Sequence, residues 1–107
     1  MFYVESEHFG RKKCEIIDDF IFEIDRNNSM YGDNAVIVCT KEVAKILFKY
    51  YAPSKTKYYS MADYNWLGSD IYIMPFLQEV DVCYILKHIS IWTMEKVFTK
   101  NTKNEDE

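Results

Sequence analysis

The chain has 107 residues with a formal net charge of -4 at pH 7, and 49% of its residues are hydrophobic and 17% aromatic. A chain of this length can bury one core without disulfides or a metal, and this much apolar material excludes an intrinsically disordered protein. We therefore expect a single globular domain over residues 1–98, followed by a disordered acidic tail over residues 99–107 that has no apolar side chain.

The first third of the chain predicts one strand and one helix. Residues 1–9 alternate loosely between apolar and polar types and predict a strand, which Gly10 and the basic triplet 11–13 then interrupt. In residues 15–25 the apolar positions recur at spacings of three and four, the pattern of an amphipathic helix. Asn, Ser, Gly and Asp cluster in residues 27–34, which predicts a turn. The apolar helical positions are Ile16, Ile17, Phe20, Ile21 and Ile24.

The next segment combines a buried strand with a capped helix. Residues 35–39 form a short continuous apolar run, as expected of a central strand that is covered on both faces. Thr40 is a favourable N-cap, and an apolar face follows at helical spacing until the sequence Ala-Pro-Ser at 52–54 ends the helix. The residues of that face are Val43, Ile46, Leu47 and Tyr50.

The last third predicts a long connection followed by strands. Residues 52–69 are polar and aromatic with no clear period, and loops of this length are often functional. Residues 71–74 predict a strand that Pro75 ends at an edge or a bulge. Residues 80–86 predict another strand, and residues 89–98 predict a further one that can continue it through a bend.

This order of elements predicts an α+β fold. Consecutive strands after two helices are typical of a two-layer sandwich, in which a mixed or antiparallel sheet of about four to five strands has both helices on one face.

The cysteines and the N-terminal sequence indicate in which cellular compartment the protein is found. Cys14, Cys39 and Cys83 are far apart and form no C-x-x-C pair, so the sequence indicates neither a disulfide framework nor a zinc site, and we expect no cofactor. No apolar run approaches the ~18 residues that span a bilayer, and Glu5 and Glu7 lie where a signal peptide would be apolar. We expect a cytoplasmic protein that does not bind a membrane.

Charged residues repeat every four positions on both predicted helices. Each series lines one helical face, and like charges at this spacing repel one another. Either each stripe is simply the solvent-exposed side of its helix, or one of them meets a partner of opposite charge. The acidic series is Glu15, Asp19 and Glu23, and the basic series is Lys41, Lys45 and Lys49.

A basic and aromatic segment over residues 41–66 is the strongest candidate for a binding surface. Five lysines and one acidic residue lie between Lys41 and Tyr59, although the whole chain is negatively charged. Lysines beside aromatic rings suit single-stranded nucleic acid, and tyrosine and tryptophan equally suit a protein interface. We predict that the partner-binding residues are Lys45, Lys49, Lys55, Lys57, Tyr58, Tyr59, Tyr64 and Trp66.

Catalysis has the weakest support. The two histidines, His8 and His88, have no neighbour at a spacing that indicates a catalytic triad or a metal site. Asp70, Glu79 and Asp81 lie on or beside predicted strands and could hold a divalent metal, but the acid-x-Lys pattern of nucleases is missing. We lean towards a protein that is not an enzyme.

We therefore expect a small protein-binding module. Phe, Tyr, Met, Ile, Asn and Lys are common and Gly, Ala, Arg and Pro are scarce, which indicates an AT-rich genome and favours the hypothesis of a phage-encoded inhibitor of a host protein. The first alternative is a single-stranded nucleic-acid-binding protein, weakened by the missing RNA-binding signatures and the negative net charge. A self-associating structural protein, as a homo-oligomer, and an acidic mimic of DNA are further alternatives.

Overall fold

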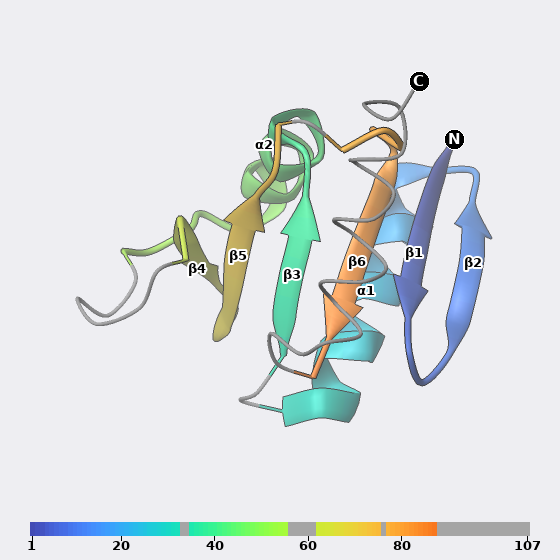
Figure 1. Ribbon diagram of the computed structural model, residues 1–107, viewed down its shortest axis with the longest axis horizontal. Coiled ribbons are helices and arrows are strands. Elements are labelled where there is room, and N and C mark those ends of the chain that lie inside the picture. The colour runs from blue at the N-terminus through green and yellow to red at the C-terminus, as the bar shows by residue number, and fades with distance from the viewer. Residues whose placement is uncertain (33–34, 56–61, 76, 88–107) are drawn as a thin grey trace, which may run out of the picture.

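A computed structural model describes residues 1–32, 35–55, 62–75 and 77–87, in which two helices lie against one sheet (Figure 1). The elements in chain order are β1 (Phe2–Ser6), β2 (Gly10–Cys14), α1 (Ile17–Tyr31), β3 (Val36–Cys39), α2 (Lys41–Tyr50), β4 (Tyr64–Trp66), β5 (Ser69–Ile73) and β6 (Val82–Leu86). Within these described ranges, no helix is long and apolar enough to cross a membrane.

The strands form one mixed sheet in the order β2-β1-β6-β3-β5-β4. β1 pairs with β6 in parallel and β3 pairs with β5 in parallel, whereas the other neighbours are antiparallel. β3 and β6 lie at the centre, and every one of their residues is buried, which explains their unbroken apolar sequences. The predicted α+β class with a mixed sheet is confirmed, with six strands in the described residues in place of about four to five.

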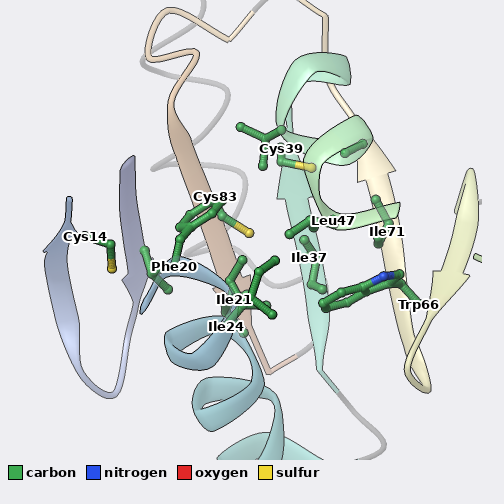
Figure 2. Close-up of a cluster of buried hydrophobic side chains, with 14 residues drawn as sticks. Cys14, Phe20, Ile21, Ile24, Ile37, Cys39, Leu47, Trp66, Ile71 and Cys83 are labelled. Carbon is green, nitrogen blue, oxygen red and sulfur yellow. The ribbon is translucent and has the colours of Figure 1, made fainter. Parts of the chain in front are cut away.

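Both helices cover the same face of the sheet, as predicted (Figure 1). One buried cluster joins them to it, and Figure 2 shows its side chains between the helices and the strands. The three cysteines are free and belong to this cluster, where they act as small hydrophobic residues. The other members of the cluster are Val4, Phe20, Ile21, Ile24, Ile37, Val43, Ala44, Leu47, Trp66, Ile71 and Ile85.

The N-terminal region forms a hairpin in place of the single strand that we predicted over residues 1–9. β1 and β2 pair in antiparallel register, with Phe2 opposite Cys14 and Ser6 opposite Gly10. The basic triplet 11–13 therefore continues the sheet and does not interrupt it. β2 is the edge strand, so its lysine side chains can stay in solvent, and charged residues there discourage pairing with another chain.

Helix α1 begins later and ends later than the predicted span of 15–25. It continues through Asn27 and Asn28 to Tyr31, so the turn that we predicted over residues 27–34 is wrong for its first half. The two asparagines are buried, and the side-chain amide of Asn27 donates a hydrogen bond to the Glu23 carbonyl over 2.8 Å. Burial against the sheet thus overrides their preference for turns. Gly32 ends the helix with a φ of 63°.

The predicted strand, N-cap and second helix are confirmed, but Tyr50 of the predicted apolar face is 43% exposed. The Thr40 hydroxyl accepts a hydrogen bond from the Val43 N–H over 3.4 Å and donates one to the Val80 carbonyl over 3.0 Å. The N–H of Tyr51 closes the last turn of α2 on the Leu47 carbonyl. This local geometry fixes the direction in which α2 leaves β3.

The connection predicted over residues 52–69 contains a hairpin that the sequence did not indicate. β4 and β5 pair in antiparallel register around a two-residue turn at Leu67 and Gly68, whose φ values are 52° and 86°. Positive φ at both positions is typical of a type I′ turn. β5 spans 69–73 in place of 71–74. β6 begins at Val82, two residues after the predicted start. The strand and tail predicted over 89–107 lie outside the described residues.

Candidate interaction surface

Helix α2 presents its lysines outward because its opposite side packs on the sheet. Val43, Ala44 and Leu47 are buried, whereas Lys45 and Lys49 are exposed. Lys41 and Lys55 are exposed as well. Within the described ranges, none of these four ammonium groups forms an ion pair with a carboxylate.

On the β1–β2 side of the molecule, by contrast, three cationic side chains form ion pairs with carboxylates. Arg11 lies 2.7 Å from Glu5 and also binds Glu79, whose hydrogen bond raises the pKa of the guanidinium. Lys12 and Arg26 both reach Glu23, over 3.2 and 3.1 Å. The lysines of α2 are therefore available to a partner in a way that Arg11, Lys12 and Arg26 are not.

Edge strand β4 brings aromatic rings to the end of α2. Tyr64 packs on Phe48 of α2, with ring centroids 5.2 Å apart. The ring of Tyr51 lies 6.0 Å from that of Trp66, whose indole N–H donates to the Tyr51 carbonyl over 2.8 Å. Tyr51 and Tyr64 nevertheless keep 51% and 40% of their surface exposed. Such half-exposed rings offer apolar contact area beside the lysines.

The chain beyond α2 is tied to the same edge. Ser54 and Asn65 exchange two backbone hydrogen bonds of 2.8 and 3.0 Å, so the residues before Lys55 run alongside β4. These contacts hold lysines and tyrosines from separate segments on one region of the surface. We call this region the α2–β4 patch and define it as Lys45, Lys49, Tyr51, Lys55 and Tyr64.

The structure agrees with only part of the predicted set of exposed site residues. Lys45, Lys49, Lys55 and Tyr64 are exposed. Trp66 is 0% exposed and belongs to the main core cluster, so the expectation that its ring faces a partner is wrong. Its hydrogen bond and its packing on the helix side of the sheet draw it inward. Three further predicted residues, Lys57, Tyr58 and Tyr59, lie outside the described residues.

Tyr51 is half exposed, but it was not among the predicted site residues. It is the first residue after α2 and directly precedes Ala52 and Pro53. Its position after the last helical turn, where the chain must leave the packed face of α2, was the signal for an exposed ring.

The acidic stripe predicted on α1 does not form one exposed surface. Glu15 and Asp19 are exposed, but Glu23 is only 2% exposed. Lys12 and Arg26 bracket the buried Glu23 carboxylate, and the Arg26 guanidinium also stacks on Phe9 at 4.0 Å. Glu23 is therefore a packing residue of the α1–β2 contact and is not available to a partner.

The residues considered for catalysis are dispersed. His8 is exposed and packs edge-on against Phe9, whereas Asp70 accepts a hydrogen bond from Asn65 over 3.2 Å. In the part of the chain that the structure describes, no three His, Cys, Asp or Glu residues gather in a way that could hold a metal ion. His88 lies outside that part.

The chain matches no family model, no curated protein and no solved structure in comparisons with all three.

Proposed function

We propose that this protein is a cytoplasmic, non-enzymatic binding module that recognises an acidic protein surface through the α2–β4 patch. The observation that supports this proposal is the group of exposed lysines that have no carboxylate partner among the described residues, next to the half-exposed Tyr51 and Tyr64. An inhibitor of a host protein would act through the same patch by covering an acidic surface of its target.

The two kinds of side chain in the patch have different physical roles. Lysines attract an acidic partner over a range of about 10 Å at 0.1 M salt and thereby raise the rate of encounter. Tyrosine rings supply contact area with little loss of conformational freedom, and such rings are common among the residues that dominate binding energy. A local positive patch on a chain with a net charge of -4 also disfavours binding in other orientations.

The proposal is tested with two variants that change the net charge equally. Lys45→Glu/Lys49→Glu reverses two charges inside the patch, whereas Lys13→Glu/Lys87→Glu reverses two exposed lysines elsewhere. We expect the protein captured from the native host by the unaltered chain to be lost with the first variant and kept with the second. Capture of the same protein by both variants would contradict the proposal.

Nuclease treatment of the captured material separates the two main classes of partner. A complex that survives nuclease and depends on Lys45 and Lys49 supports protein recognition. A complex that nuclease destroys would favour the nucleic-acid alternative. Circular dichroism of each variant verifies that the fold is unchanged.

A further inference from the structure

The turn between β4 and β5 has a leucine at a position that disfavours this residue. Among the described residues, Leu67 is the one residue other than glycine with a positive φ, at 52°. A left-handed backbone brings the β-carbon of an L-residue close to the following carbonyl oxygen, so Gly, Asn and Asp are the usual residues there. A two-residue turn of this type is typically Asn-Gly or Asp-Gly, and the sequence Leu67-Gly68 differs at its first position.

The contacts around the turn hold Leu67 in this conformation. Trp66 and Ser69, on either side of the turn, are both buried. The side-chain oxygen of Asn65 accepts a hydrogen bond from the Gly68 N–H over 3.1 Å. Strained residues persist where the surrounding structure fixes them, and they are frequent at binding sites.

Packing among the described residues gives no reason for a leucine at this position. Leu67 keeps 48% of its surface exposed, and it belongs to neither of the two apolar clusters. A single exposed leucine is common on protein surfaces. An exposed leucine that also strains the backbone, however, costs stability and contributes little to folding. This combination indicates a role outside folding.

Leu67 adjoins the α2–β4 patch. It directly follows Trp66, whose ring packs against Tyr51 and whose indole N–H binds the Tyr51 carbonyl. The antiparallel bridge between Ser54 and Asn65 continues this contact along β4. This edge of the sheet therefore carries three half-exposed apolar side chains next to the lysines, namely Tyr51, Tyr64 and Leu67.

We propose that Leu67 is an apolar anchor of the α2–β4 patch, and that the partner carries aliphatic side chains among its carboxylates. The inference rests on the proposed function, in which the lysines attract an acidic surface. An aliphatic side chain that docks on Leu67 leaves water together with it and adds affinity that charge attraction does not supply. The strained turn already exposes Leu67 in the free protein, so little conformational freedom is lost on docking.

Two acidic peptides of equal length and charge test the anchor, one of Glu-Glu-Leu repeats and one of Glu-Glu-Ser repeats. We expect the unaltered chain to bind the leucine peptide about tenfold more tightly, as the burial of one leucine side chain allows. Leu67→Asn should remove this preference without changing the affinity for the serine peptide, whereas Leu67→Met should retain it. A preference that is absent from the unaltered chain, or that survives in Leu67→Asn, would overturn the proposal.

Failure of the anchor and failure of the proposed function give different results with these peptides. Lys45→Glu/Lys49→Glu should weaken the binding of both peptides, and unchanged binding would contradict recognition through the lysines. Binding that depends on Lys45 and Lys49 but shows no preference for leucine would overturn the anchor alone.

The stability of Leu67→Asn separates an anchor from a structural residue. Asn accepts a positive φ, so we expect the urea midpoint of this variant to lie above that of the unaltered chain although its binding is weaker. Leu67→Ala keeps the strained β-carbon and should lose the leucine preference without a gain in stability. A lower urea midpoint for Leu67→Asn would show that Leu67 holds the hairpin together and would overturn the proposal.

Discussion

The indole N–H of Trp66 donates a hydrogen bond of 2.8 Å to the backbone carbonyl of Tyr51, and this bond joins edge strand β4 to the end of α2. The buried ring therefore supports the exposed patch from beneath. In this arrangement Trp66 positions Tyr51, whose ring lies 6.0 Å from the indole and is half exposed in the proposed binding patch.

Replacement of Trp66 by Phe keeps an aromatic ring in the core and removes the donor to Tyr51. We expect the free energy of unfolding to fall by about 1–3 kcal/mol, because the Tyr51 carbonyl loses its hydrogen-bond donor and the smaller ring leaves a space in the core. Urea unfolding measures the change. Tyr64→Phe, which alters an exposed ring, should shift stability by less than about 0.5 kcal/mol. Equal losses in both variants would contradict the supporting role of Trp66.

Among the acidic residues of α1, Glu23 should contribute most to the free energy of unfolding. Glu23→Gln leaves Lys12 and Arg26 without their shared carboxylate, and we expect a loss of about 1–3 kcal/mol in the free energy of unfolding. Glu15→Gln is the matched control, because Glu15 is exposed and should tolerate the same change within about 0.5 kcal/mol. If the two variants unfold at the same urea concentration, Glu23 does not hold α1 to β2.

Thr40 should be sensitive to the loss of its hydroxyl group alone. Thr40→Ala removes the N-cap of α2 and the bond to the Val80 carbonyl, at a cost of about 1–2 kcal/mol. Thr40→Ser retains the oxygen and should recover most of that stability. Thermal unfolding of the unaltered protein, Thr40→Ser and Thr40→Ala tests whether stability decreases in that order. A serine variant as unstable as the alanine variant would refute the prediction.

The buried thiols should make the protein less stable in alkali. Burial raises the pKa of Cys39 to about 12 and also raises that of Cys83. The thiols ionise at a lower pH in the unfolded chain, near pH 8.5. Their contribution to stability is therefore complete below that pH and is lost as the pH rises towards 12.

Urea unfolding at pH 7.5 and pH 10 measures this loss, and Cys39→Ala/Cys83→Ala should reduce the difference between the two pH values. In the native protein both thiols should react slowly with a disulfide reagent and become reactive on unfolding. Rapid reaction of both thiols in the folded state would contradict their burial in the main core.

The segment from Val36 to Tyr50 could be predicted because local signals agree with tertiary packing there. The apolar run fits a central strand, and Thr40 caps the helix whose apolar face meets the sheet. The β1–β2 hairpin could not be predicted, since an edge strand tolerates three exposed basic residues that resemble a loop in sequence. At the β4–β5 turn, Leu67 adopts positive φ, which its residue type does not indicate.

The candidate site could also be predicted only in part from the sequence. The spacing of Lys41, Lys45 and Lys49 correctly placed them on the outer face of a helix, because that face is fixed by the apolar residues opposite. Composition could not separate Tyr64 from Trp66, since both are aromatic residues of β4. Only the tertiary packing places Trp66 in the main core cluster and leaves 40% of Tyr64 exposed.

Recognition of an acidic partner through the α2–β4 patch is tested most directly by the association rate of the purified partner, measured at several salt concentrations. We expect the rate for the unaltered protein to fall as salt rises, because lysines of the α2–β4 patch attract an acidic surface. Lys45→Glu/Lys49→Glu should bind more slowly at low salt and lose that dependence, whereas Lys13→Glu/Lys87→Glu should keep it. An identical salt dependence in all three proteins would contradict recognition through this patch.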